Sequence, residues 1–195
     1  MIVSMEYLAR ESDSTGFRVE ILEKVLHLLH LLQSLNIHPF LKGKLALKGG
    51  SALNLFLFNL PRLSVDIDLN YIGSRTKNEM LAERPKLEKS IRDVCNREGY
   101  TVRKMPEEHA GGKWQILYKS ALGHGGKLEI DVNFMFRIPL WPVGLYDSIK
   151  VGRSRALGIP VIDVHELAAG KMAALFSRSA ARDLFDVHRY REHSL

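Results

Sequence analysis

The sequence predicts an α/β (α+β) fold in which a short mixed sheet packs against flanking helices and is followed by C-terminal helices. Two segments that alternate apolar residues with carboxylates, 65–69 and 127–136, indicate strands of this sheet. Apolar residues recur at helical spacing over 16–35 and 77–98, which indicates two amphipathic helices packed against it.

The first strand of the sheet lies ahead of a glycine turn. Residues 45–48 (LALK) are largely apolar and end at Gly49 and Gly50, where the backbone freedom of glycine favours a turn. Ser51 then opens the apolar run SALNLFLF, and serine is a preferred residue at the N-cap of a helix. We therefore expect a strand, a turn and a helix in succession.

A run of short strands is predicted between the second amphipathic helix and the C-terminal part. Residues 100–104 and 113–119 are expected to pair across a turn, and the glycines of 123–126 form the hairpin that leads into 127–136. Residues 138–158 contain prolines and glycines and are expected to form a long irregular connection.

The C-terminal part is helical in pattern. Asp163 and Glu166 form an Asp-x-x-Glu capping box at the start of HELAAGKMAALFS, and 181–192 (ARDLFDVHRYRE) predicts a second helix. The 195 residues are thus expected to form a single domain, with an α/β core over about 1–150 and a helical part over about 160–195.

Two carboxylates leave the same face of the segment VDIDL. Asp66 and Asp68 alternate with aliphatic residues, as strand side chains on opposite faces do. Two like charges on a half-buried strand repel each other and are costly to desolvate. The pair therefore requires a counter-charge, which is either a basic side chain such as Arg62 or a divalent cation.

A turn suited to phosphate binding precedes this pair. It runs from Lys48 to Ser51 (KGGS), at the expected start of a helix whose free amides carry partial positive charge and can bind an anion. Gly-Gly-Ser before a helix is also an ordinary turn. Together, the turn and the acidic pair favour a site for a nucleotide phosphate and its cation.

A second acidic face lies on the segment KLEIDVNFMF. Glu129 and Asp131 share this face with Lys127 and Asn133, opposite an apolar face. The same alternation is normal for the solvent-facing side of an antiparallel sheet, so the residues alone do not decide between a site and a solvated surface.

These features resemble the nucleotidyltransferase superfamily, whose first motif places Gly-Gly or Gly-Ser ahead of Asp-x-Asp. The form RLSVDIDL (62–69) is similar to that of the AbiEii/AbiGii toxin family. Two later blocks extend the resemblance, GKMAAL (170–175) and ARDLFDV (181–187). The three blocks stand in the same order as in that family and cover about residues 45–190.

The resemblance implies a nucleotidyltransferase fold and the transfer of a nucleotide from a nucleoside triphosphate to an acceptor. Asp66 and Asp68 would hold Mg²⁺ or Mn²⁺. Such folds commonly place a third carboxylate on a neighbouring strand, and Asp131 is the candidate, with Glu129 as the reserve. Asp131 would complete a two-metal site or take the proton of the attacking hydroxyl.

The resemblance also assigns residues to the nucleotide. Lys171 is similar to the lysine that neutralises the triphosphate, and Asp183 to the acid that orients this lysine or the acceptor, so both are catalytic candidates. The other nucleotide-binding candidates are Lys48, Gly49, Gly50, Ser51, Arg62 and Ser64.

Relatives in this family are commonly toxins of type IV toxin–antitoxin or phage-defence systems, and some add nucleotides to the acceptor end of tRNA. The resemblance therefore implies tRNA or another RNA as an acceptor and a cognate antitoxin as a partner. Family members commonly continue into a larger helical region, so part of the acceptor-binding surface is expected to lie outside this chain. Two alternatives stay open: a small-molecule (aminoglycoside-type) nucleotidyltransferase, and a non-catalytic nucleotide-binding regulatory protein.

Composition is that of a soluble globular protein with a basic surface. The chain has 28 Lys and Arg against 22 Asp and Glu, a formal charge of +6, which favours polyanions such as RNA. Much of the excess lies over 75–104 and in the last twenty residues, and these segments are expected to flank a groove that holds the acidic centre. Cys95 alone can form no intramolecular disulfide. With no membrane span and no secretory pattern in the sequence, we expect the cytoplasm.

Overall fold

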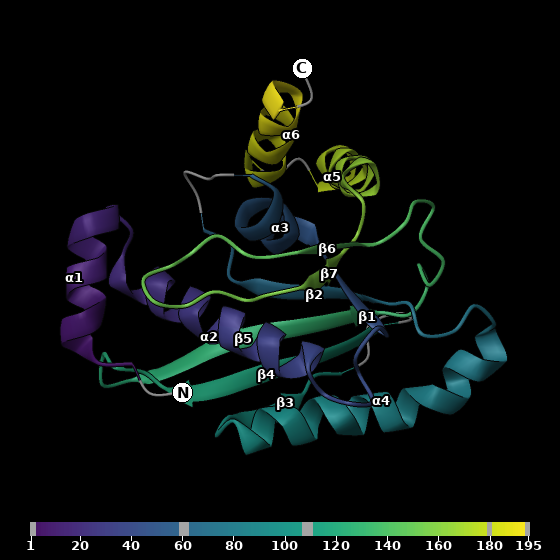
Figure 1. Cartoon of the computed structure of the whole chain (residues 1–195), viewed down its shortest axis with the longest axis horizontal. Helices are drawn as coiled ribbons and strands as arrows, with labels where there is room; N and C mark the ends of the chain where they lie inside the picture. Colours follow the sequence, from purple (N-terminus) through teal and green to yellow (C-terminus); the bar gives the residue numbers. More distant parts are fainter. Residues whose placement is uncertain (1–2, 59–62, 107–110, 179–180, 194–195) are drawn as a thin grey trace.

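A mixed sheet forms the middle layer of the molecule (Figure 1). The computed structural model describes residues 3–58, 63–106, 111–178 and 181–193. Within these ranges seven strands form one sheet: β1 (Leu45–Lys48), β2 (Asp66–Tyr71), β3 (Thr101–Lys104), β4 (Gly111–Lys119), β5 (Gly125–Asn133), β6 (Gly144–Tyr146) and β7 (Ile159–Val161). Their order is β3-β4-β5-β2-β1-β7-β6. The β2–β5 and β1–β7 pairs are parallel and the other neighbours are antiparallel.

Helices cover both faces of this sheet. They are α1 (Met5–Thr15), α2 (Val19–Asn36), α3 (Gly49–Ala52) with the π-helical turn η1 (Leu53–Leu57), α4 (Lys77–Arg97), α5 (Val164–Arg178) and α6 (Ala181–His193). Figure 1 shows α2 and α4 on one side of the sheet and α3, α5 and α6 on the other. Among the described residues, no helix combines the length and the apolar character needed to cross a bilayer.

The core lies between the sheet and the pair α2 and α4. Ile67 and Leu69 of β2, Ile130 and Val132 of β5 and Trp114 of β4 are all buried on this face. Because successive strand residues point to opposite faces, the carboxylates between these apolar residues must point toward α3 and α5. The hydrophobic pattern of the strands therefore decides on which face a polar site can form.

Most of the predicted elements are confirmed. The helices predicted over 16–35 and 77–98 correspond to α2 and α4, and the strands predicted over 45–48, 100–104 and 127–136 correspond to β1, β3 and β5. The mixed α/β fold is thus the observed one. The sequence analysis did not predict α1, in which Leu8 is the buried residue.

One short strand lies inside the segment expected to be an irregular connection, and a second follows directly after it. β6 lies inside 138–158 and β7 directly follows it, and each is three residues long. Strands this short carry no measurable alternation, so only their pairing with each other and with β1 defines them. Gly111 and Gly112, expected in a turn, lie in β4 opposite β5.

Two helix starts also differ from the prediction. The helix after β1 begins at Gly49, so Ser51 is not its N-cap; the Ser51 hydroxyl donates to the carbonyl of Asp66 instead. At α5, Asp163 Oδ1 accepts the amide of His165 (2.8 Å), as a capping residue does, but Glu166 does not close the capping box. Its carboxylate binds backbone amides of the loop before β6.

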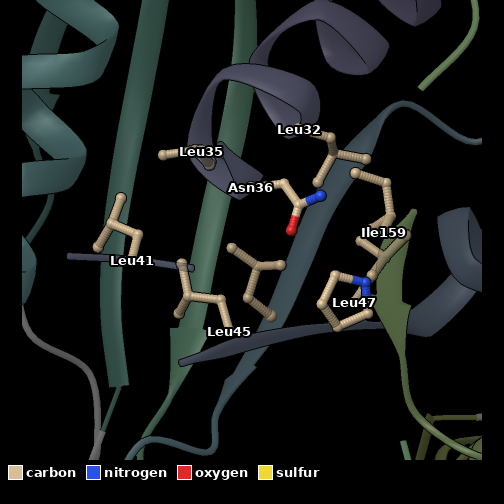
Figure 2. A pocket seen from close by; sticks show the side chains of 9 residues that line it. Leu32, Leu35, Asn36, Leu41, Leu45, Leu47 and Ile159 are labelled. Atoms are coloured by element: carbon tan, nitrogen blue, oxygen red, sulfur yellow. The ribbon is translucent and has the colours of Figure 1, made fainter. Parts of the chain in front are cut away.

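A small apolar hollow lies on the core side of the sheet, between the end of α2, β1 and β7. Figure 2 shows leucine and isoleucine side chains lining it, together with Asn36, whose amide donates to the carbonyl of Gly158 (3.0 Å). Its volume of about 20 Å³ is that of a single water molecule at most. It is a packing defect of the core and lacks the polar groups of a binding site.

The buried histidine of α2 predicts a loss of stability in mild acid. His27 is 3% exposed, its Nδ1 lies 2.7 Å from the hydroxyl of Tyr100, and its ring packs on that of Tyr118. Burial lowers the pKa of His27 from 6.5 to about 4. Below pH 6.5 the unfolded chain gains a proton that the folded chain does not accept, so stability falls as pH drops toward 4, by up to about 3 kcal/mol.

Urea denaturation at pH 7 and at pH 4.5 measures this difference, with His27→Gln as the matched control. The wild-type protein should lose more stability between the two pH values than the variant does. Equal losses in both proteins would show that His27 does not carry the effect.

Candidate functional site

The register of the sheet brings acidic side chains from two strands together. Asp68 of β2 lies opposite Asp131 of β5, and Asp66 lies opposite Glu129. Lys48 of β1 lies opposite Asp68 on its other side. The side chains of these four acids and of Lys48 point away from the core. Each of them is next to a buried apolar residue in its strand, and successive side chains point to opposite faces.

These side chains line a cleft of about 420 Å³ between the sheet, the start of α3 and the helix α5. The segment that leads into β2 forms one wall, and β4 contributes a lysine. The lining residues are Gly50, Leu63, Ser64, Val65, Asp66, Asp68, Lys113, Glu129, Asp131 and Lys171. The first and last of these come from elements more than a hundred residues apart, so the cleft exists only in the folded chain.

The cleft holds excess negative charge. Burial raises the pKa of Asp68, and the neighbouring carboxylates of Asp66 and Asp131 raise it further, against the opposing effect of Lys48 and Lys171. In the described part of the chain, no salt bridge joins Asp66, Asp68 or Asp131 to a basic side chain. The arrangement therefore favours a cation bound from solution.

Glu129 differs from these three carboxylates. Its Oε2 lies 2.8 Å from Nζ of Lys113 on β4, which forms a salt bridge across the two strands. This hydrogen bond is also the main reason that the pKa of Lys113 is raised. Asp131 lies directly opposite Lys113 in the register, but among the described residues the salt bridge of Lys113 is made with Glu129.

Lys171 is a mostly buried lysine held by two acids. Its side chain is 11% exposed, and its Nζ lies 2.7 Å from Oδ2 of Asp186 and 3.3 Å from Oδ1 of Asp183. Both acids are buried on α6, one helical turn apart. This contact fixes the ammonium group at the wall of the cleft, on the helix side of the carboxylates.

The glycine turn before α3 packs directly against the acidic pair. Gly49 has a φ of +72°, and a Cβ added there would overlap Oδ2 of Asp68. Both the backbone conformation and the space require glycine at this position. Gly50 lines the cleft, whereas Ser51 is fully buried and uses its hydroxyl to bind the carbonyl of Asp66. The side chain of Ser51 thus holds β2 against the turn and does not reach the cleft.

Three candidates from the sequence, Ser64, Lys48 and Arg62, remain to be placed. Ser64 lines the cleft and Lys48 lies beside Asp68. Arg62 lies outside the described residues. Lys113 and Asp186 belong to the site although the sequence did not single them out as such. The spacing of Asp183 and Asp186 was a signal for a shared helix face, but Lys113 could be found only from the register of β4.

The basic segment 75–104 does not flank the acidic centre as expected. Most of it forms α4, which covers the opposite face of the sheet (Figure 1). Several of its charges are used in ion pairs on or beside the helix, such as Lys89 with Asp93 and Arg84 with Glu88. The net charge of this segment therefore says little about the cleft.

Comparison with known proteins agrees with this geometry. The model of the family described as "Nucleotidyl transferase AbiEii toxin, Type IV TA system" matches residues 30–195. The chain belongs to the AbiEii nucleotidyl transferase toxin family. The match includes β1, β2, α5 and α6, the elements that carry the carboxylate pair and Lys171. The family predicted from the three sequence blocks is confirmed.

A solved structure supports the fold of this AbiEii-family chain. This chain is similar to the solved structure of MenT4, a nucleotidyltransferase toxin from Mycobacterium tuberculosis H37Rv, with a TM-score of 0.62 and 22% sequence identity. The similarity covers 94% of this chain and 63% of MenT4, so the chain spans less than two thirds of that toxin. At this identity the likeness shows a shared fold. No curated protein matches the sequence.

The residues of the cleft fit a magnesium-like cation. Within the described residues, no group of three His, Cys, Asp or Glu side chains is close enough to hold a metal ion by itself. Mg²⁺ is usually bound by one or two carboxylates, with substrate phosphates and water supplying the other oxygens. Asp66, Asp68 and Asp131 are hard oxygen donors on one sheet face and fit this type of coordination.

Repulsion within the cleft predicts that Asp68→Asn stabilises the protein. Because the pKa of Asp68 is raised, its ionised form destabilises the fold, and stability falls as pH rises from 3.8 through the folded-state pKa. Removing the charge should raise Tm at pH 7 by roughly 2–4 °C, as about 1 kcal/mol does in a chain of this size.

Differential scanning calorimetry without divalent cations measures the change. Asp13→Asn, on the exposed face of α1, is the control and should leave Tm unchanged. Added Mg²⁺ should stabilise the wild-type protein more than Asp68→Asn. A lower Tm for Asp68→Asn would contradict an uncompensated charge at this position.

Proposed function

We propose that this chain is a divalent-cation-dependent nucleotidyltransferase, the toxin of a type IV toxin–antitoxin system, which transfers a nucleotide from a nucleoside triphosphate to an acceptor. One observation carries the proposal. Carboxylates without basic partners among the described residues line one side of a cleft, and a buried lysine lies at its other side. A triphosphate with its cation supplies charge of both signs in that arrangement.

Asp66, Asp68 and Asp131 are the residues proposed to hold Mg²⁺ or Mn²⁺. When bound, the cation would neutralise phosphate oxygens and the charge that develops on them. Asp131 is preferred to Glu129 as the third acid, because Glu129 is already paired with Lys113. Asp131 would complete this metal site or take the proton of the acceptor hydroxyl.

The other side of the cleft would bind the phosphates. Gly50 lines the cleft, and its amide and that of Gly49 would bind phosphate oxygens; Ser64, Lys48 and Arg62 are the further candidates for this role. Lys171 would stabilise charge on the leaving group, since its two acids on α6 hold it in place before substrate arrives. Asp183 therefore acts as a positioning residue in this proposal.

The proposed reaction is a single displacement. The oxygen of an acceptor hydroxyl forms a bond to the α-phosphorus, the bond to the β-phosphate oxygen breaks, and pyrophosphate leaves. We propose tRNA or another RNA in the cytoplasm as the acceptor and a cognate antitoxin as the regulatory partner. The family of the chain and its net charge of +6 support this choice.

Substitution of the acids tests which of them act in transfer. Asp131→Asn should lower the rate of nucleotide transfer by about 100-fold or more, as loss of a charged group at a reacting centre does. Glu129→Gln is the matched control in the same strand and should change the rate only a few-fold. The measurement is pyrophosphate release at fixed Mg²⁺ concentration. Equal losses in both variants would remove the distinction between the two acids.

The acceptor is identified by incubating the protein with each of the four radiolabelled nucleoside triphosphates and bulk tRNA. Label should appear in RNA, and RNA binding should weaken steeply with rising salt, because phosphate contacts release counterions. Label found in the protein or in a small molecule would show that this species, and not RNA, is the acceptor. Unchanged transfer and unchanged Mg²⁺-dependent nucleotide binding in Asp66→Ala/Asp68→Ala would contradict the proposed chemistry.

A further inference from the structure

The loop after β5 presents large apolar side chains to solvent. Phe136 is 70% exposed, Leu140 80%, Met135 65% and Trp141 45%. Single exposed apolar residues are common, but several large ones within one short loop are typical of a binding surface.

This loop is held in place at both ends. At its start, Oδ1 of Asn133 accepts the amides of Met135 (2.8 Å) and Phe136 (3.0 Å). At its end, the Glu166 carboxylate of α5 accepts the amides of Leu140 and Trp141. The exposed side chains therefore project from a backbone that side chains of β5 and α5 have already fixed.

The loop is hydrogen-bonded to β5 and α5, two elements that each carry lining residues of the cleft. Asn133, which binds its first amides, shares a face of β5 with Asp131. Glu166, which binds its last amides, lies on the same helix as Lys171. In Figure 1 the green segment between β5 and β6 leaves the sheet on the side where α5 lies. The loop thus joins the two elements that carry opposite sides of the candidate site.

We propose that Phe136 and Trp141 form a stacking platform for unpaired bases of a single-stranded nucleic acid acceptor, whose terminal hydroxyl enters the cleft. This inference rests on the proposed transferase function. The net charge of +6 attracts a polyanion to the protein, but the carboxylates of the cleft repel its last phosphates. Contacts with the uncharged faces of the bases would hold the strand end there, and aromatic stacking suits every base.

Two features favour nucleic acid over a protein partner at this position. The loop that carries the platform is bound by side chains of β5 and α5, the same two elements that carry Asp131 and Lys171 of the cleft in which the acceptor must react. The two rings are anchored differently: Phe136 stands free in solvent, whereas the Trp141 ring packs beside His165 with centroids 5.6 Å apart. About half of Trp141 remains exposed for a further ring.

The test measures binding of an unstructured oligoribonucleotide of about 12 nucleotides by fluorescence anisotropy. Phe136→Ala should weaken binding by about 5- to 100-fold, the loss of 1–3 kcal/mol of stacking. Phe136→Tyr, which keeps the ring, should bind as the wild-type protein does. Leu140→Ala is the matched control, since it removes an equally exposed apolar side chain that cannot stack.

Three outcomes decide the proposal. A Phe136→Ala protein that binds the oligonucleotide normally would overturn it. So would equal losses in Phe136→Ala and Leu140→Ala together with self-association of the wild-type protein, which would make the loop a protein-docking surface. Loss confined to Phe136→Ala and to Trp141→Ala, with Trp141→Phe binding normally, would support it.

The two proposals can fail separately. Asp66→Asn/Asp68→Asn should abolish transfer while oligonucleotide binding persists. If no acceptor is ever labelled but RNA binding depends on Phe136, the platform stands and the transferase function falls. If transfer to a small molecule occurs without dependence on Phe136, the reverse holds.

Discussion

Negative charge gathered on one face of the sheet is the constraint on which the rest of this structure depends. Apolar residues in β2 and β5 must face α2 and α4 to form a core, so Asp66, Asp68 and Asp131 must share the opposite face. Without a bound cation, repulsion among these carboxylates lowers the stability of the fold. A hydrophobic substitution at one of them would relieve this repulsion. The same feature that weakens the free protein is the one that would bind a metal–nucleotide complex.

The surrounding elements are arranged around that face. Gly49 allows the turn before α3 to approach Asp68, and Ser51 ties this turn to the strand that bears the acids. On the helix side, α6 supplies two buried acids that fix Lys171. The helices after the sheet therefore complete the cleft, and the match to the AbiEii family over residues 30–195 includes them.

Local pattern was sufficient for much of the fold and for half of the site. Alternation in VDIDL placed Asp66 and Asp68 on one face, and helical spacing predicted α2 and α4. What local pattern could not supply was pairing between distant segments. The choice of Asp131 over Glu129 depends on Lys113 of β4, and the burial of Lys171 depends on how α5 meets α6. The same limit explains Ser51 and Glu166, typical capping residues whose side chains bind tertiary partners instead.

The central claim is that these acids bind a cation together with a nucleotide. A crystal structure with Mn²⁺ and a non-hydrolysable nucleoside triphosphate tests it most directly, because anomalous scattering locates the metal independently of the nucleotide. A Mn²⁺ peak is expected at the carboxylates of Asp66 and Asp68, with phosphate oxygens between Gly50 and Lys171. Nucleotide bound elsewhere, or bound in the cleft with no metal at the two acids, would contradict it.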